Sequence, residues 1–266
     1  MLKLDAYKLK WIAIFGMVLS HMIYAWWDIM PMWLVYPLSF VGGFTFPIMA
    51  FFVAEGYRHT SNLGKYIFRL FIFGVIATPF HILVIGLPWL NIMFAIILGL
   101  LVLMLYDKIK YRVLFWLLYA ILIIPLSTLF FEWYFIGITM VLMYHIIRNE
   151  TARRIVPPIF AGVCWLVLGA LSIVSFTAMG MTSPEVVVTE GLFRNSGFLM
   201  NIYFMYALIP FGLGCFLVAF FLKNYNGERG KKMRWLFYAI YPLHFAVLAA
   251  IAFALGLIDI NLMLGL

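Results

Sequence analysis

The chain has 266 residues, of which 67% are hydrophobic and only 11% are charged, and its formal net charge is +8. Soluble domains use about 25% charged residues, so this chain could not cover a water-facing surface and is expected to use lipid as its solvent. The composition therefore excludes a soluble protein. It predicts a single integral-membrane domain over residues 1–266, an all-α polytopic helix bundle.

Apolar runs of about 20 residues cross the core of a bilayer, and the runs in this sequence predict nine such helices. In chain order they lie at 10–28, 34–57, 64–86, 89–106, 113–129, 133–148, 156–177, 197–222 and 234–257. Gly42-Gly43 and Pro47 predict a kink or a point of close packing in the second span. Asn91, at the start of the fourth span, is expected to cap its helix.

The basic residues predict the orientation of the bundle. Of the 18 lysines and arginines, all but Arg194 lie before the first span, in alternate connections between spans, or in the span ends that border them. By the positive-inside rule these connections are cytoplasmic, which places the N-terminus inside and the C-terminus outside the cytoplasmic (inner) membrane. The same asymmetry and anionic lipid headgroups account for the net charge, so we expect no nucleic acid among the partners.

The first polar pair within a span is Ser20 and His21. His21 follows Lys10 by 11 residues, which is about 16 Å along a helix and close to the middle of the membrane. An ionisable side chain at that depth is costly, so it is a candidate functional group. Either His21 is hydrogen-bonded between helices for packing, or it is a base that accepts protons near the bilayer centre.

The next polar group is a cluster at residues 55–69, on the cytoplasmic side of the second and third spans. Glu55 shares a helix face with Arg58 and His59 at i+3 and i+4, and Lys65 and Arg69 are also four residues apart. One interpretation is an ion pair that anchors the helix end. Arg69 is deeper and needs an anion, for which Glu55 is the nearest candidate in the sequence. The other interpretation is a site for a phosphorylated ligand from the cytosol, because Arg and Lys match phosphate oxygens.

Later in the chain the pattern is weaker. His81 lies near the outer end of the third span, and Glu132 on the outer side is expected to be solvated. His145 and Arg148 close the sixth span, and Arg153 and Arg154 follow it. This run is more typical of a stop signal than of a ligand site. Cys164 and Cys215 lie inside spans, where they are interpreted as small apolar residues, and no motif predicts a metal site.

The last span carries a second imidazole at mid-depth. His244 follows Arg234 by ten residues, about 15 Å, and sits in the segment FYAIYPLHF, where Pro242 predicts a kink. His21 and His244 therefore lie at about the same depth and could share one cavity. His244 could equally be structural.

Four stretches of this sequence resemble the TraX family, whose named member is an F-pilin acetylase. They are FPIMAFFVAEGYRHTSNLGKYIFRLFIFGVIATPF, IAIFGMVLSHMIY, LNIMFAIILGLL and LFYAIYPLHF, and the resemblance runs from about residue 10 to residue 250. Two departures stand out. The family pattern has an Asp before the first-helix histidine, where this chain has Ser20. It has an Arg just before the Phe-Pro pair, where this chain has Gly42, Gly43 and Phe44.

The resemblance implies an acyltransferase that takes an acyl group, in the first place acetyl, from cytoplasmic acyl-CoA. His21 would be the base that activates an amine or hydroxyl acceptor, with Ser20 and His244 completing the catalytic group. The residues implied to face the CoA phosphates are Glu55, Arg58, His59, Lys65 and Arg69. The acceptor, whether a peptide N-terminus, a sugar or a small molecule, and the oligomeric state are not implied.

Two other functions remain open from the sequence. One is a small-solute transporter or channel in which His21, His81 and His244 line a proton or substrate path. The other is a non-catalytic factor for assembly in the membrane. Binding of CoA to the purified protein would favour the acyltransferase, whereas flux of a solute without any acyl donor would favour the transporter.

Overall fold

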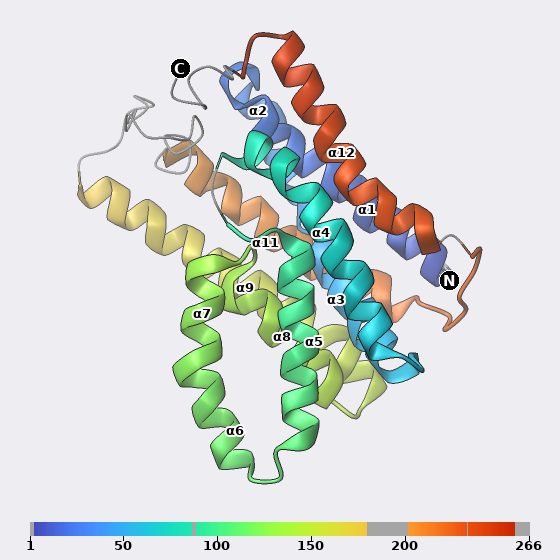
Figure 1. Ribbon diagram of the computed structural model, residues 1–266. Coiled ribbons are helices and arrows are strands. Elements are labelled where there is room, and N and C mark those ends of the chain that lie inside the picture. The colour runs from blue at the N-terminus through green and yellow to red at the C-terminus, as the bar shows by residue number, and fades with distance from the viewer. Residues whose placement is uncertain (1–2, 87–88, 180–201, 233, 259–266) are drawn as a thin grey trace.

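The computed structural model describes residues 3–86, 89–179, 202–232 and 234–258, and within these ranges every regular element is a helix (Figure 1). The prediction of an all-α polytopic membrane bundle is confirmed. In the described part, six helices are long and apolar enough to cross a membrane. The count of nine crossings and the orientation remain predictions. The expected outer connection with Arg194, and the start of the eighth span, lie outside the described residues.

The helices follow the predicted spans closely, with differences at their ends. They are α1 (Ala6–Ala25), η1 (Trp27–Ile29), α2 (Met32–Gly42), α3 (Thr45–His59), α4 (Leu63–Ile85), α5 (Ile92–Lys108), α6 (Arg112–Leu118), η2 (Tyr119–Ile123), α7 (Ile124–Phe130), α8 (Tyr134–Ile146), α9 (Glu150–Ala178), α11 (Ile202–Lys223) and α12 (Arg234–Ala254). The largest difference is α9, which begins six residues before the predicted start of the seventh span.

The second predicted span is two helices, α2 and α3, which meet at Gly43 and Phe44. A Cβ atom on Gly43 would lie 2.2 Å from the backbone oxygen of Phe211 in α11, so no side chain fits there. The prediction of a close-packing point in this span is confirmed. The break matters for function because α3 carries Glu55 away from α2 towards the charged end of the bundle.

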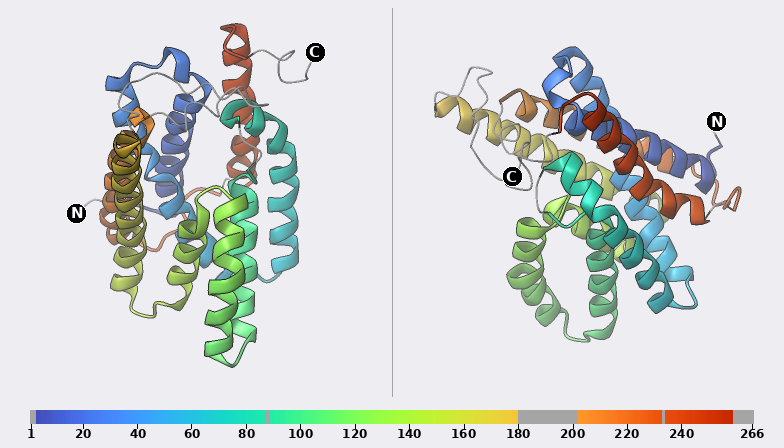
Figure 2. Two further views of the ribbon diagram at one scale, coloured as in Figure 1. Left: turned by 90° about the vertical axis from the view of Figure 1, so that its left-hand side faces the viewer. Right: turned by 45° about the horizontal axis from the view of Figure 1, so that its top comes forward.

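The fifth predicted span is continuous but irregular. A turn of π-helix at Tyr119–Ile123 joins α6 to α7, and Pro125 follows directly at the start of α7. Proline has no backbone N–H, so a local change of hydrogen-bond register before it is a common way to keep a helix continuous. The continuous helix formed by α6, η2 and α7 pairs with α5 at the edge of the bundle, away from α1 and α12 (Figures 1 and 2).

Three helices far apart in the sequence, α1, α4 and α12, lie side by side and form one wall of the bundle (Figures 1 and 2). On the other side α9 packs along α11, which also contacts α2. Basic residues gather at one end, which we call the basic end. It contains the N-terminus and the α3–α4, α5–α6, α8–α9 and α11–α12 connections, joined by contacts such as the 3.1 Å bond from Leu4 N to Asn224 O.

The start of α5 is fixed by a buried asparagine. The Asn91 side chain accepts from Met93 N at 3.1 Å, which confirms the predicted helix cap. Its amide nitrogen donates to Gly74 O at 2.9 Å and to Thr78 Oγ1 at 3.2 Å in α4. These bonds join the start of α5 to the turn of α4 that precedes Pro79.

Candidate functional site

The basic end opens into a pocket of about 560 Å³ between α1, α3, α4, α12 and the α11–α12 connection. Four cationic side chains line it, from three of these elements: Lys10, Arg69, Arg229 and Lys231. The pocket reaches inward as far as Met93 and Ile96 of α5. It is thus a cavity with a charged mouth and an apolar inner end.

Aromatic rings form much of the pocket wall and lie under the cations. The Nζ atom of Lys10 lies 5.0 Å from the centre of the Phe52 ring and 5.3 Å from that of Phe237. The Arg69 guanidinium lies 5.9 Å from the centre of the Tyr238 ring. Such cation–π contacts hold the charges at the cavity surface without neutralising them, which leaves them free to bind anions.

The α11–α12 connection is held over the pocket by the N-terminal residues. Leu4 pairs with Tyr225 through backbone bonds, and Ala6 N donates to Glu228 O at 2.9 Å. Gly230 has φ +65°, and a Cβ atom there would lie 2.8 Å from Asp5 and Tyr7. Only glycine fits this position, and it sets Arg229 and Lys231 on the pocket rim.

Tyr225 adds a neutral donor to this rim. Burial and then the nearby Glu55 carboxylate raise the pKa of its phenol, so the hydroxyl stays protonated at neutral pH. The ring packs edge-on against Phe51 and Phe52 at 5.7 Å. The rim therefore combines fixed cations with an uncharged hydroxyl.

Arg69 lines the pocket but is not the partner of Glu55, contrary to the pairing suggested by the sequence. Its Nε atom is buried and has no hydrogen-bond partner among the described residues. A buried unpaired guanidinium nitrogen is costly, which favours a bound anion at this position. The structural reason for the difference is that Glu55 forms its ion pair with an arginine of another helix.

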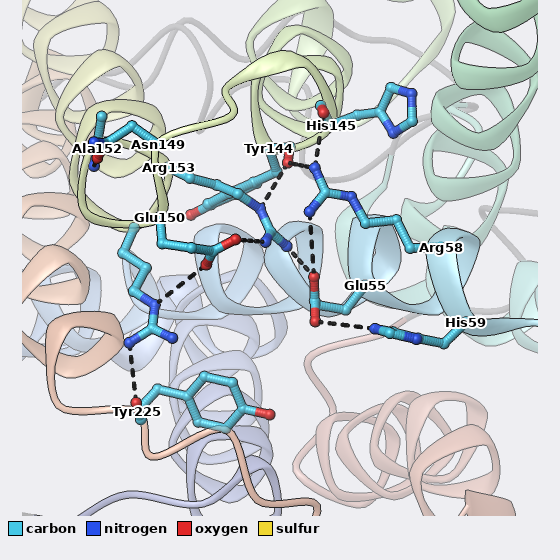
Figure 3. A network of polar contacts seen from close by, with 11 residues as sticks. Glu55, Arg58, His59, Tyr144, His145, Asn149, Glu150, Ala152, Arg153 and Tyr225 are labelled. Carbon is cyan, nitrogen blue, oxygen red and sulfur yellow. Dashed lines mark hydrogen bonds and ion pairs between the residues drawn. The ribbon is translucent and has the colours of Figure 1, made fainter.

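That arginine is Arg153 of α9, which is only 3% exposed and hydrogen-bonds the Glu55 carboxylate (Figure 3). Arg153 also donates to Glu150 at 2.9 Å and to Tyr144 O at 2.8 Å. The basic run after the sixth span is therefore more than a stop signal. One of its members neutralises Glu55, so this acid does not cancel the cations of the pocket.

The other members of the predicted 55–69 cluster divide into two groups. His59 lines the pocket and lies 3.7 Å from Glu55, whereas Arg58 and Lys65 do not line it. Arg58 instead donates to the backbone oxygens of Tyr144 at 3.2 Å and His145 at 2.8 Å, at the end of α8 (Figure 3). A cation on these free carbonyl groups is a helix cap, so Arg58 joins α3 to α8.

The structure brings together the two imidazoles that the sequence predicts at mid-depth. His21 Nδ1 lies 2.9 Å from His244 Nε2, and the rings are stacked with their centres 5.0 Å apart. The Phe245 ring contacts both, at 4.6 Å from His21 and 4.2 Å from His244. The pair lies between α1 and α12, on the wall that also carries the pocket.

The hydrogen bonds of His244 define the proton positions in this pair. His244 Nδ1 lies 3.1 Å from Ile240 O, and a carbonyl oxygen can only accept, so Nδ1 carries the hydrogen. In the neutral ring Nε2 is then the acceptor, and His21 Nδ1 must donate to it. This leaves His21 Nε2 without a hydrogen. The geometry thus presents His21 Nε2 as a base and orients it through His244.

Ser20 does not orient His21. Its hydroxyl donates to Met17 O at 3.0 Å, within α1. Its Cβ atom packs against Gly42, where an added Cβ atom would lie 2.6 Å away. The place that a carboxylate could take beside the histidine is filled by a small residue, and the orienting role passes to His244 on α12.

Neither histidine lines the pocket, but both helices connect the two regions. On α12 His244 lies seven residues, about 10 Å, beyond Phe237, and on α1 His21 lies about 16 Å beyond Lys10. A spacing of seven or eleven residues returns to the same helix face. The pair therefore lies in line with the pocket, deeper in the bundle.

His81 and Glu132 form a second buried pair towards the opposite end. His81 Nε2 lies 2.8 Å from Glu132 Oε1, and the Glu132 side chain is only 14% exposed. The expectation that Glu132 is solvated was wrong. The backbone of the α7–α8 connection bonds to Leu90, with Leu90 N to Phe130 O at 2.8 Å and Glu132 N to Leu90 O at 3.2 Å, and this turns the carboxylate inward.

Sequence reasoning missed four residues of this site, namely Lys10, Arg153, Arg229 and Lys231. Each was interpreted only as a marker of topology, because a basic residue at the end of a span is the usual signal for a cytoplasmic connection. The two glycines between Asn226 and Lys231 were a usable signal. They allow a tight connection that turns adjacent cations towards the bundle.

Two comparisons with known proteins find matches that cover most of this chain. The model of a family described as "TraX protein" matches residues 6–252. A protein of Dichelobacter nodosus named "Probable fimbrial assembly protein FimC, serogroup H1" is 28% identical over 263 residues, which cover 92% of this chain and 95% of that protein. No solved structure matches this chain.

Proposed function

Because the chain belongs to the TraX family, we propose that it is a membrane-embedded acyltransferase that uses acyl-CoA, in the first place acetyl-CoA, as donor. The acceptor is an amine or a hydroxyl group. The observation that carries this proposal is the His21–His244 pair, whose hydrogen bonds leave His21 Nε2 unprotonated. The basic end faces the cytosol, where the donor is available, and the protein resides in the cytoplasmic membrane.

The pocket at the basic end supports the donor assignment. CoA carries phosphate groups and an adenine ring, and the pocket offers cations for the first and aromatic rings for the second. Arg69 has an unpaired buried Nε, and Arg229 and Lys231 stand on the rim. The pantetheine arm of the donor would extend along α1 and α12 and carry the thioester towards the histidine pair.

The histidine pair supplies the proton chemistry. His21 Nε2 removes a proton from the acceptor nitrogen or oxygen as that atom attacks the thioester carbonyl carbon. The carbon–sulfur bond breaks, and the thiolate of CoA takes the proton back from His21. His244 Nε2 accepts the hydrogen bond of His21 Nδ1 throughout, which stabilises the transient imidazolium.

A specific observation favours a second candidate, a non-catalytic factor in pilus assembly. The relative from Dichelobacter nodosus is named as a probable fimbrial assembly protein, which describes a role in assembly and not a reaction. The acyltransferase proposal is compatible with such a role, since acylation of a membrane-bound subunit could be one assembly step. The two candidates differ in whether the purified protein turns over acetyl-CoA.

The test is an assay of purified protein with acetyl-CoA and hydroxylamine as a surrogate acceptor. The hydroxylamine nitrogen attacks the acetyl carbon, the carbon–sulfur bond breaks, and the free CoA thiol is measured with a thiol reagent. We expect thiol release that depends on the protein and is lost in His21→Gln. CoA that binds without any thiol release would contradict the acyltransferase and leave the assembly factor.

A further inference from the structure

His81 is completely buried, yet half of its hydrogen-bonding capacity is unused. Nε2 is paired with Glu132 at 2.8 Å, whereas Nδ1 has no partner among the described residues. An unpaired polar atom in the interior is costly, because it loses its bond to water and gains none. The Nδ1 atom therefore needs a hydrogen-bond partner, and a bound ligand could be the source of it.

The partner of His81 is held in place by an unusual backbone. Trp133 and Tyr134, directly after Glu132, have φ of 64° and 48°, although neither is glycine. Two adjacent residues with a side chain in the left-handed region are strained, and such conformations concentrate at functional sites. Trp133 is fixed by stacking on Phe46 with ring centres 4.9 Å apart. The fold thus keeps Glu132 against His81 at the expense of backbone strain.

His81 shares a neighbour with the proposed base. The Phe245 ring contacts His81 edge-on at 5.3 Å and His21 at 4.6 Å. The two imidazoles therefore lie within about 10 Å of each other. His81 comes from α4 and His21 from α1, and both rings pack against Phe245 of α12.

The charge of Glu132 determines which nitrogen of His81 is free. An ionised carboxylate can only accept hydrogen bonds, so His81 Nε2 carries the hydrogen, and in the neutral imidazole Nδ1 then presents a lone pair. We propose that His81 Nδ1 binds the acceptor substrate by accepting a hydrogen bond from it, and that Glu132 is a positioning residue for His81. This inference rests on the proposed acyl transfer.

The proposal narrows the class of acceptor. One hydrogen of the acceptor goes to His21 Nε2 in the reaction, so the hydrogen bond to His81 Nδ1 needs a second one. Acceptors that offer two donor hydrogens close together are primary amines and neighbouring hydroxyl groups. A lone hydroxyl on an otherwise apolar molecule would satisfy only one of the two imidazoles.

The experiment compares two variants that keep volume and polarity. Glu132→Gln can both donate and accept, so it no longer fixes the tautomer of His81. His81→Gln can donate to Glu132 and still present an oxygen near the place of Nδ1. With hydroxylamine as probe, we expect Glu132→Gln to raise the KM for hydroxylamine about tenfold, the effect of one hydrogen bond. The KM for acetyl-CoA should stay unchanged, and His81→Gln should lie close to the wild type.

A matched control pair, His145 and Asp107, lies at the opposite end of the helix bundle. His145 Nε2 lies 2.9 Å from Asp107 Oδ1, and its buried Nδ1 also has no partner in the described part of the chain. This pair lies near the end of α8, whereas Glu132 precedes the start of the same helix. Asp107→Asn should therefore leave both KM values unchanged.

A second measurement does not depend on turnover. Solid-state NMR of 15N-histidine-labelled protein distinguishes protonated from unprotonated ring nitrogens, and we expect an unprotonated Nδ1 at His81 in the wild type and a mixture in Glu132→Gln. A wild type that turns over hydroxylamine, with KM unchanged in Glu132→Gln, would overturn the acceptor site and leave the acyltransferase intact. A wild type without turnover would overturn both. A protonated Nδ1 in the wild type would overturn the role of Glu132.

Discussion

His21 Nδ1 and His244 Nε2 lie 2.9 Å apart although the two residues are separated by 223 positions in the chain. One imidazole orients the other, in the place where many enzymes use a carboxylate. A neutral partner can exist at mid-membrane depth without the cost of a buried charge. The pair is therefore a way to build an oriented base within a lipid environment.

Replacement of His21 should abolish turnover without loss of the fold. We expect His21→Gln to lower kcat by about 10²–10⁴, because glutamine can hydrogen-bond but cannot take the proton. The melting temperature and the CoA affinity should stay close to those of the wild type. Ser20→Ala is the control and should retain activity, since within the described residues the Ser20 hydroxyl bonds only to Met17 O. Near-normal acyl transfer by His21→Gln would show that the histidine is structural.

Replacement of His244 should have a smaller effect that depends on His21. His244→Phe keeps a ring but cannot accept from His21 Nδ1, so we expect kcat to fall about ten- to a hundredfold, the cost of one charge-assisted hydrogen bond. The double variant His21→Gln/His244→Phe should be no slower than His21→Gln, because the two residues act as a unit. Losses that multiply in the double variant would indicate separate roles.

The structure separates two arginines that the sequence placed in one cluster. Arg69→Gln should weaken CoA binding about ten- to a hundredfold, because Arg69 faces the pocket and its Nε is unpaired. Arg58→Gln should leave CoA affinity unchanged and lower the melting temperature, because Arg58 caps α8. Calorimetry with CoA and thermal unfolding would measure both. Equal losses of affinity in the two variants would contradict this pocket.

The Glu55–Arg153 pair should be critical for stability. Arg153→Met removes the nearest cation of Glu55 and Glu150, which keep Arg58 and Arg154 respectively, each 3.9 Å away. Breaking a fully buried pair costs about 3–5 kcal/mol, and because these two acids are partly exposed we expect a loss below that range. Unfolding of the purified variant should show this loss. Glu55→Gln/Arg153→Met should recover part of it, since the double variant leaves no charge at position 55 or 153. A double variant less stable than Arg153→Met would rule out the pairing as the cause.

The orientation can be tested at the C-terminus. Nine crossings with a cytoplasmic N-terminus place Leu266 outside, so a reporter enzyme that works only outside the membrane should be active when fused after Leu266. A second fusion after Lys110, in a predicted cytoplasmic connection, should be inactive. Activity at Lys110 and none at Leu266 would reverse the orientation.

The helices and the matching level of His21 and His244 in the bundle could be predicted from the sequence, because length, hydropathy and helical rise are local properties. The partners could not. Glu55 binds Arg153, 98 positions away, and Glu132 turns inward to His81 because backbone bonds at Leu90 and two residues with positive φ direct it there. Neither relation has a local signature. Likewise, Lys10, Arg229 and Lys231 meet only because the N-terminal residues pair with the α11–α12 connection.

The pairing of the N-terminal residues with the α11–α12 connection determines when the pocket can form during synthesis. The pocket joins the first ten residues to residues 225–238, and the partner of His21 lies on the last described helix, so nearly the whole chain must emerge from the ribosome first. Until then α1 stands in the membrane with an unpaired imidazole at mid-depth, and the cations of the pocket are scattered. A chain that stops before α12 therefore has most of its helices but lacks the His21–His244 pair and the α12 side of the pocket, and we expect such an incomplete product to lack the proposed activity.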